Sequence, residues 1–338
     1  MAGTPNINDS MVRTLGEWGQ FFDKAGKPNN IIELMDQDNS ILDDIKFMEA
    51  NGFDGHTTTI RNGLPEVYWR RLYKGIPPSK SRVSKVKDAC GMLEARSEID
   101  VKMLELHASQ AKAYRASEAK AFMEAMRQKL ATTILYGSIE NNPDGFHGLD
   151  PRYAHKNAPQ VIDAGGATAD KCTSLFGVVW GENEVHGIFP KDSQAGLRHK
   201  PLPEHDAYDA DGNAYRAVGD LFEWNVGLTV RDWRCVVRVC NIDTTKLILE
   251  KGEAGFVDLH RLTVRAKNMI PTEKRNRLVW YANQDVMTAL ELQASDAGYV
   301  HLVYGDLFRS KNVPFLHGCG VRQLDAILST ENPLAAMP

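Results

Sequence analysis

A reversal of charge within the first third of the chain limits the folds that are open to it. Residues 61–87 are basic, with eight Lys or Arg side chains against one acid, in two extended halves around a bend at Gly75, Pro77 and Pro78. No apolar face in this basic hairpin is wide enough to form a core. Residues 31–49, the acidic segment, carry six acids against one lysine. Because a hairpin that cannot bury itself needs a partner of opposite charge, this pattern is typical of an assembling protein.

Length and composition indicate a folded protein with more than one domain. The chain has 338 residues, of which 43% are hydrophobic and 25% charged, and its net charge is −4. Such a chain has room for two or three domains. The near-neutral balance argues against a dedicated nucleic-acid binder, because such domains are strongly basic. No apolar run reaches the ~20 residues of a membrane span, and residues 1–18 lack the basic start and apolar middle of a signal peptide. We therefore expect no membrane partner.

Helical periodicity is clearest in the middle of the chain. Residues 118–136 present an apolar stripe, with Ser117 as the expected N-cap and Gly137 just beyond the end. The opposite face is charged, as on a helix that lies along a sheet. Helices are also predicted at 255–268 and at 284–295, the second with Asn283 as its N-cap. The spacing of apolar residues predicts one or two further helices in the acidic segment.

After residue 140 the sequence changes to short β-rich runs. The predicted strands cover 174–180, 185–189, 227–230 and 234–240, and a strand-like run covers 313–328. Turn residues at 209–213 predict the tip of a hairpin over about 200–222. Since neither a βαβ alternation nor an internal repeat is present, the fold class is α+β.

The sequence contains no recognisable constellation of an enzyme, a metal centre or a cofactor site. The five cysteines are scattered without a CxxC pair, and none of the ten histidines has the spacing of a zinc site. The glycine-rich run 163–166 lacks the spacing of a nucleotide-binding loop. Arg231, Asp232 and Arg234 are interpreted as a structural ion-pair group at a turn. We expect no catalytic residue, no metal and no cofactor, so the chain is not expected to be an enzyme.

Several blocks of the sequence resemble the major capsid proteins of tailed bacteriophages, above all those of short-tailed phages of enteric and respiratory bacteria. The blocks are collinear over most of residues 30–330, which makes the resemblance more specific than a single motif. They are GLPEVYWRRLYKGIPPSKS (63–81), DACGMLEARSEID (88–100), RASEAKAFMEAMRQKLATTILYG (115–137), FHGLDPRY (146–153), VVWGENEVHGIFPKDSQAGL (178–197) and GLTVRDWRCVVRVCNID (227–243).

The resemblance implies the Hong Kong 97-type capsid fold. Its parts, carried onto this chain, are an N-terminal arm (1–52), an extended E-loop (53–98) with residues 75–78 at its tip, a peripheral domain with a long spine helix (99–145), a mainly axial domain (146–310) with the 200–222 hairpin as an excursion, and a return strand to the peripheral domain with the C-terminal tail (311–338).

Three groups of residues are the expected functional positions. The charge pattern and the resemblance together place subunit-interface contacts on the E-loop and on the acidic part of the arm. The E-loop residues are Arg61, Arg70, Arg71, Lys74, Lys80 and Arg82. Their expected acidic counterparts are Glu33, Asp36, Asp43 and Asp44. The expected core of the spine helix consists of Phe122, Met126 and Leu130.

The function that the resemblance implies is that of the repeating subunit of an icosahedral shell. Copies of the chain would form hexamers and pentamers, assemble in the host cytoplasm and become part of the virion. Further partners would be a portal, a decoration or scaffolding protein, and packaged double-stranded DNA contacted without sequence specificity. Two alternatives remain open: a soluble α+β enzyme with an unrecognised site, and a DNA-binding module that uses the basic hairpin as a β-ribbon.

Two departures limit what the resemblance transfers. The namesake of the fold joins its subunits through Lys–Asn isopeptide bonds, and nothing here marks a catalytic Glu for that reaction, although Asn62 and Lys80 lie in the E-loop. The chain also lacks a long Glu- and Lys-rich N-terminal extension that would serve as a fused scaffold. A separate scaffolding protein, or none, remains open.

Overall fold

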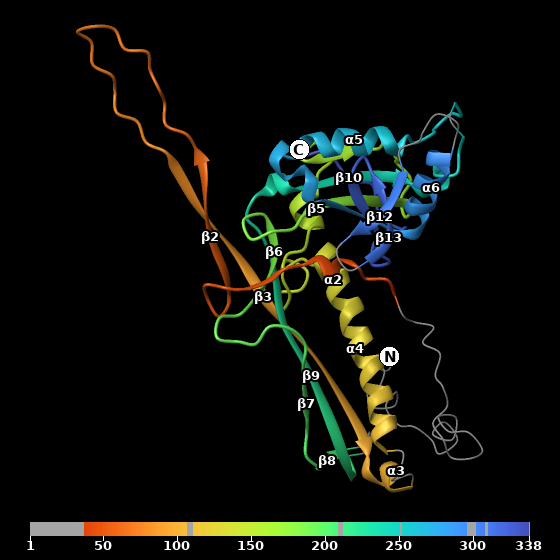
Figure 1. The fold of residues 1–338 in the computed structure, drawn as a ribbon. Helices are drawn as coiled ribbons and strands as arrows, with labels where there is room; N and C mark the ends of the chain where they lie inside the picture. Colours follow the sequence, from red (N-terminus) through yellow and green to blue (C-terminus); the bar gives the residue numbers. More distant parts are fainter. Residues whose placement is uncertain are drawn as a thin grey trace, which may run out of the picture. The chain divides into compact units, whose positions relative to one another are not determined.

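The computed structural model describes residues 37–106, 111–208, 212–250, 252–295, 302–307 and 310–337. The chain divides into two compact units. The described residues of the first unit fall within 92–130 and 196–224 together with residue 37, and those of the second fall within 38–91, 131–195 and 225–337. Three long elements, β3 (Arg82–Asp100), α4 (Ala111–Tyr136) and β9 (Ala214–Val230), contribute residues to both units (Figure 1).

In the first unit, two short strands pair with the long strand β9. These are β7 (Arg198–Pro201) and β8 (His205–Tyr208), and both run antiparallel to β9. The register places Tyr208 opposite Ala214, so the chain reverses between them. The hairpin predicted over 200–222 is therefore confirmed, although part of its tip, residues 209–211, lies outside the described residues. The short helix α3 (Val101–Leu106) precedes α4.

The helix α4 packs its apolar side on β9 within the first unit. Met126 and Leu130 are buried, with exposed fractions of 3% and 1%. Phe122 is half-buried and stacks on Phe222 of β9, with ring centroids 5.8 Å apart and planes inclined by 11°. Stacked rings of this kind add to the stabilisation that apolar burial provides. The three residues expected in the core of the spine helix thus face other parts of the protein.

The ends of α4 test the boundaries predicted from local sequence. The predicted C-terminal end is confirmed, since α4 ends at Tyr136 and Gly137 donates its amide to the Thr133 carbonyl at 2.8 Å. The predicted N-cap, Ser117, is wrong, because Ser117 lies inside the helix. Residues 111–116, AKAYRA, are mostly good helix formers and carry the helix past the serine.

The second unit contains a seven-stranded mixed sheet. Its strand order is β12 (Leu302–Leu307), β13 (Ser310–Leu316), β14 (Cys319–Gln323), β11 (Leu278–Ala282), β5 (Cys172–Val179), β10 (Val236–Asp243) and β4 (Val161–Asp163). Every residue of β5, β10 and β11 is buried, which explains why these strands show no regular alternation of apolar and polar residues.

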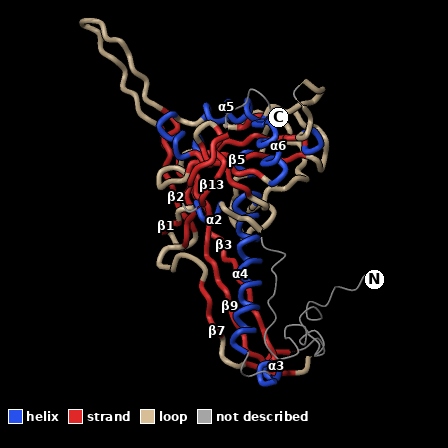
Figure 2. Tube along the Cα trace, turned by 45° about the vertical axis from the view of Figure 1, so that its right-hand side comes forward, coloured by secondary structure: helices blue, strands red, loops and turns tan. Residues whose placement is uncertain are grey.

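Two α-helices, α5 and α6, lie beside this sheet in the second unit (Figures 1 and 2). The helix α5 (Leu259–Met269) begins after the N-cap Asp258, whose side chain accepts the Arg261 amide, so it starts later than predicted. The helix α6 (Gln284–Ser295) has the predicted bounds. Its predicted N-cap is confirmed, because Asn283 Oδ1 accepts the Val286 amide at 3.0 Å. Short 3-10 helices complete the unit: η1 (Asp150–Tyr153), η2 (Trp233–Cys235), η3 (Thr244–Lys246) and η4 (Thr272–Arg277).

A buried ionic network ties the C-terminal tail to strands β5 and β10 of this sheet. Arg238 of β10 is 1% exposed, and its guanidinium donates to Asp150 at 2.5 Å and to Glu331 at 3.1 Å. Glu331 also accepts the hydroxyl protons of Tyr136 and Ser174, each at 2.5 Å. Because a buried charge without a partner is very costly, these groups hold residue 331 firmly against β5.

The acidic segment differs from its prediction. Among its described residues, the only helix is the single turn α2 (Ile41–Asp44), and β1 (Phe47–Glu49) follows as a strand that pairs in parallel with β6 (Val185–Phe189). The prediction of helix in the acidic segment is therefore wrong over residues 45–49, because the pairing with a distant strand overrides local periodicity. The part before residue 37 lies outside the described residues.

The C-terminal run that the sequence predicts as strand-like forms two strands. The strand-like run over 313–328 is divided between β13 and β14, and β14 pairs in parallel with β11. Both strands therefore belong to the seven-stranded sheet of β5 and β10, the segments that we assigned mainly to the axial domain.

Candidate assembly surface

The basic hairpin is rooted in an antiparallel strand pair of the second unit. The strand β2 (Gly55–Gly63) pairs with the first half of β3, from Gly55 opposite Ala89 to Gly63 opposite Arg82. Gly55 has a φ of 155°, and a Cβ at this position would lie 2.2 Å from the Asp88 carbonyl oxygen. Only glycine fits where the two strands begin to separate from the body of the unit.

A buried ion pair fixes the root of the hairpin. Asp88 of β3 is 5% exposed, and Arg152 of η1 donates to its carboxylate at 2.8 Å. The same guanidinium donates to the carbonyls of His147, Gly148 and Leu228. An arginine with several fixed acceptors cannot move without breaking them together, so the start of the hairpin is held in one position.

Two histidines and an arginine lie beside this ion pair. His56 of β2 and His186 of β6 are both buried and meet edge to face, with ring centroids 6.0 Å apart. Arg231 Nη2 lies 3.0 Å from His56 Nε2. Burial and the positive charge of Arg231 lower the pKa of His56, and the same causes lower the pKa of His186 to about 4. Both imidazoles are therefore neutral at pH 7.

Beyond the strand pair the hairpin continues as two extended arms without a ladder (Figure 2). The reversal is a turn from Arg71 to Lys74, in which the Lys74 amide donates to the Arg71 carbonyl at 3.2 Å and Tyr73 has a φ of 64°. The tip expected at residues 75–78 is therefore wrong. Consecutive prolines fix φ and push the residue before each of them into extended conformations, so this run continues an arm and does not reverse it.

Large apolar side chains on the first arm and in the turn are almost fully exposed. Five of them, with exposed fractions between 84% and 103%, are Leu64, Val67, Trp69, Leu72 and Tyr73. Isolated exposed apolar residues are common, but a contiguous group that contains Trp and Tyr is typical of a surface that a partner covers.

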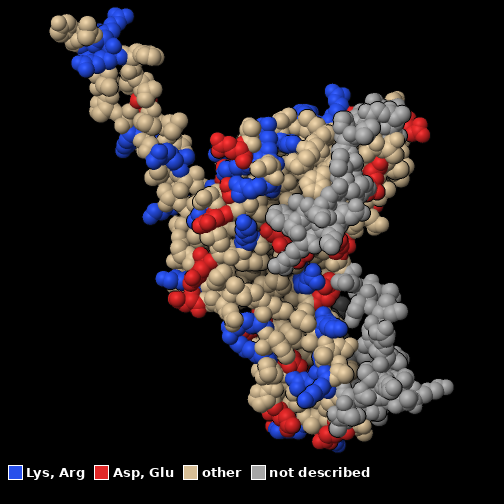
Figure 3. All heavy atoms as spheres, viewed as in Figure 1, with Lys and Arg blue, Asp and Glu red and all other residues tan. Residues whose placement is uncertain are grey.

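The basic side chains of the hairpin share this exposure. All six E-loop residues expected at an interface, Arg61 to Arg82, are exposed. Figure 3 shows Lys and Arg spread along the hairpin with almost no acid among them. Within the described part of the chain, none of the six pairs with a carboxylate; at the root, Lys87 pairs with Asp54 at 2.5 Å. The charge of these six side chains is thus not neutralised by any carboxylate of the described residues.

The acids expected to receive this charge have different positions. Glu33 and Asp36 lie outside the described residues, and Asp43 is exposed at the end of α2. The prediction that Asp44 lies at a subunit interface is wrong. Its side chain is fully buried, pairs with Arg322 at 3.1 Å and accepts a hydrogen bond from the Tyr281 hydroxyl at 2.6 Å. Burial raises the pKa of Asp44 despite these partners. A carboxylate enclosed in its own subunit cannot meet a neighbour.

Sequence reasoning found the charges of the hairpin and missed its apolar contact residues. The sequence did contain an indication of these residues. The hairpin offers no second set of apolar residues against which the side chains of Leu64, Val67, Trp69 and Leu72 could pack. The residues that root the hairpin were also missed, because His186 and Arg152 are distant in sequence from β2 and β3.

The described residues contain no group of three or more His, Cys, Asp or Glu that could hold a metal ion. All five cysteines are free thiols. Burial raises the pKa of Cys90 to about 11 and the pKa values of Cys235 and Cys240 to about 12, so these thiols stay protonated at pH 7. None of the helices in the described ranges combines the length and the apolar character that a membrane crossing requires.

The rooted, uncovered hairpin, the long helix and the mixed sheet together define a class of protein. A chain in the near-atomic cryo-EM structure of bacteriophage Epsilon15 matches with 28% sequence identity and a TM-score of 0.73, over 99% of this chain and 99% of that chain. The fold is the Hong Kong 97-like fold of tailed-phage major capsid proteins.

The family follows from the sequence itself. The model of the family "Major capsid protein GP7" matches residues 23–335, and the chain belongs to this family. It is a structural subunit of a phage capsid and a component of the virion shell. Weaker structural similarity is found to the capsid of a native GTA particle, with 9% identity and a TM-score of 0.46 over 68% of this chain and 99% of that chain. Similarity to Microbacterium phage Oxtober96 is of the same kind, with 9% identity and a TM-score of 0.44 over 67% of this chain and 98% of that chain. Comparison with curated proteins finds no match.

Proposed function

We propose that copies of this chain assemble into hexamers and pentamers of an icosahedral shell that encloses double-stranded DNA, with each basic hairpin docked on a neighbouring subunit. The observation that carries the proposal is the exposed stretch of the hairpin over residues 64–74: apolar side chains between 84% and 103% exposed lie in the same stretch as basic ones that pair with no carboxylate of the described residues. Apolar anchors in a charged rim are the usual composition of a protein interface.

The proposed contact joins unlike surfaces. A closed ring or shell requires heterologous contacts, in which one patch of a subunit meets a different patch of the next. The hairpin is the first patch. The second patch remains the acidic part of the arm, with Glu33, Asp36 and Asp43, while Asp44 no longer belongs to it because it is buried.

The domain boundaries of the resemblance are part of the proposal. We assign an arm to 1–52, the E-loop to 53–98, a peripheral domain to 99–145, a mainly axial domain to 146–310, and a return strand to the peripheral domain with the C-terminal tail to 311–338. The exposed ends of β2 and β3 support the second assignment, and α4 supports the third. A portal, a decoration or scaffolding protein and assembly in the host cytoplasm complete the proposed setting, in which the chain has no catalytic role.

Packaged DNA is the proposed content of the shell and is held without specific contacts. Tight binding through many lysine–phosphate contacts would hinder both packaging and release. The net charge of −4 suits a wall that contains DNA. Free subunits are expected to bind duplex DNA weakly, without sequence preference, and to lose it near physiological salt. Sequence-specific or salt-resistant binding would favour the alternative, a DNA-binding β-ribbon.

Electron microscopy of the expressed protein tests the proposal directly. The wild-type chain should form closed particles, whereas replacing Arg70, Arg71 and Lys74 with Glu should leave a folded subunit that forms none. The substituted side chains project from a hairpin and support no core, so folding is unaffected, while like charges now meet across the contact. A control variant with Arg70→Lys and Arg71→Lys keeps the charge and should assemble. Normal particles from the glutamate variant would show that the hairpin is not the docking element.

A further inference from the structure

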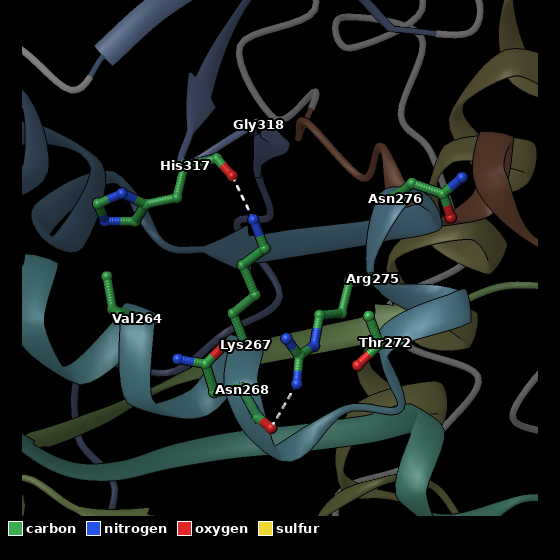
Figure 4. A pocket seen from close by; sticks show the side chains of 8 residues that line it. All are labelled: Val264, Lys267, Asn268, Thr272, Arg275, Asn276, His317 and Gly318. Carbon is green, nitrogen blue, oxygen red and sulfur yellow. Dashed lines mark hydrogen bonds between the residues drawn. The ribbon is translucent and has the colours of Figure 1, made fainter.

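A cavity of about 530 Å³ lies beside the last turns of α5 in the second unit (Figure 4). Three elements form its walls: α5, η4 and the turn between β13 and β14. Its polar lining consists of Lys267, Asn268, Thr272, Arg275, Asn276 and His317. Among the described residues, none of those that line it is Asp or Glu. Two permanent cations, two amides and a hydroxyl therefore surround a space without an opposing charge.

The two cations are held in position by neutral oxygens. Lys267 Nζ donates to the His317 carbonyl at 2.5 Å. Arg275 donates through Nε to the Ile270 carbonyl at 2.8 Å and through Nη2 to the Asn268 carbonyl at 2.9 Å. Figure 4 shows Lys267 reaching from α5 to the His317 carbonyl and Arg275 pointing toward Asn268 at the end of α5. Carbonyl oxygens orient these groups without cancelling their charge, and each cation keeps further N–H donors.

Two other basic side chains of η4, Lys274 and Arg277, are paired with carboxylates. Lys274 pairs with Asp232 at 3.1 Å and with Glu184 at 3.3 Å, and Arg277 pairs with Glu184 at 3.0 Å. These two side chains are neutralised within the subunit. Lys267 and Arg275, which line the cavity, therefore differ from Lys274 and Arg277, whose charges are paired with carboxylates.

The surroundings add to the positive potential. Residues 259–277 contain six Lys or Arg and a single acid, Glu273. Arg261 and Arg265 are exposed on α5 and pair with no acid among the described residues. A concave site lined by one sign of charge concentrates ions of the opposite sign.

We propose that this cavity binds a compact oligophosphate anion, a short chain of linked phosphate groups. Lysine and arginine donors in a fixed spacing suit phosphate oxygens, and the amide groups of Asn268 and Asn276 add neutral donors. A volume of about 530 Å³ accommodates several linked phosphates, which carry more charge in that space than a carboxylate does. Apart from the His317 ring, the described lining offers no aromatic wall for a nucleobase, so the phosphate chain is the recognised part. This proposal goes beyond the shell function and does not depend on it.

Calorimetric titration of the full-length unassembled subunit with sodium tripolyphosphate tests the proposal. Binding should be saturable at one site per subunit and should weaken by about tenfold or more in Lys267→Gln and in Arg275→Gln, since each removes a charge-assisted donor set. The matched control is Arg265→Gln, which removes the same charge from α5 outside the cavity and should change the affinity by less than about twofold. Arg275→Lys keeps the charge but loses the guanidinium fork and should give an intermediate loss. Thermal unfolding of each variant confirms that it is folded.

Three results would overturn the proposal: no saturable binding, an equal loss in Arg265→Gln, or short duplex DNA that binds as tightly as tripolyphosphate and depends on the same two residues. The last result would identify the phosphate source as the DNA backbone. Titration with dATP separates the remaining sources, because affinity similar to that of tripolyphosphate confirms that the base is not recognised. Particle formation, followed separately by electron microscopy, is expected in every variant, so failure of the cavity and failure of the shell function remain distinguishable.

Discussion

Trp69 provides the sharpest test of whether the hairpin anchors a contact between subunits. It should contribute nothing to the stability of the isolated subunit and a large part of the free energy of assembly. Its side chain is 103% exposed, so it supports nothing in its own subunit. Trp69→Ala should therefore change the free energy of subunit unfolding by less than about 0.5 kcal/mol. The whole effect should appear in assembly.

The size of the assembly effect follows from the area that the ring can bury. An aromatic side chain buries roughly 150–250 Å², which at ~25 cal/mol per Å² corresponds to about 4–6 kcal/mol as an upper limit. Ordering of the hairpin and imperfect packing reduce this to the roughly 2–4 kcal/mol of an interface hot spot. A loss of about 2 kcal/mol per contact weakens each contact by roughly 30-fold. Because every subunit repeats the contact, the variant should not close shells at wild-type concentrations.

The assay compares the protein concentration at which particles appear, by light scattering and electron microscopy, for wild type and three variants. Trp69→Phe keeps most of the ring area and should retain assembly. Ile248→Ala truncates an apolar side chain that is 80% exposed outside the hairpin, and it should behave as wild type. Shell formation by Trp69→Ala at the wild-type concentration would refute the idea that the apolar tip anchors the contact.

Three further predictions concern the body of the subunit. Glu331→Gln should lower the free energy of unfolding by about 3 kcal/mol in denaturant titration, because it leaves buried Arg238 with one carboxylate in place of two; an unchanged midpoint would contradict this. Phe122→Asp should lower the free energy of unfolding by several kcal/mol and reduce the yield of soluble protein. Glu124→Ala in the same helix should lower it by at most about 1 kcal/mol. Equal losses in the two variants would mean that both faces of α4 are buried. Lowering the pH from 7 to 5 should reduce the free energy of unfolding by roughly 2 kcal/mol through His186. The folded pKa of about 4 lies below the unfolded value, so the unfolded chain gains the proton first as the pH falls. Urea unfolding of His186→Leu should lack this part of the pH dependence.

Local sequence predicted the elements whose boundaries depend on nearby residues. The bounds of α6 follow from Asn283, whose side chain caps an amide three residues away. The end of α4 follows from Gly137, and the strand β6 from its β-rich run between turns. Charge content is likewise readable without a structure, so the excess of basic residues in the hairpin could be expected from composition alone.

Predictions failed where the deciding partner is distant in the chain. The sequence of 45–49 favours a helix, yet the pairing of β1 with β6 makes it a strand. Asp44 reads as one of several surface acids, and only the tertiary structure places it against Arg322 and Tyr281. The same holds for His186, which gains its low pKa from burial and from Arg231.

The sequence by itself thus determined the class of the fold, the resemblance to capsid proteins and the position of the basic hairpin. The tertiary structure alone decided which hairpin side chains are uncovered, where the hairpin turns, and which of the candidate charges remain available to a neighbour. The physical reason is that caps, turns and charge runs act over a few residues. Burial, ion pairing and strand pairing depend on groups that only folding brings together.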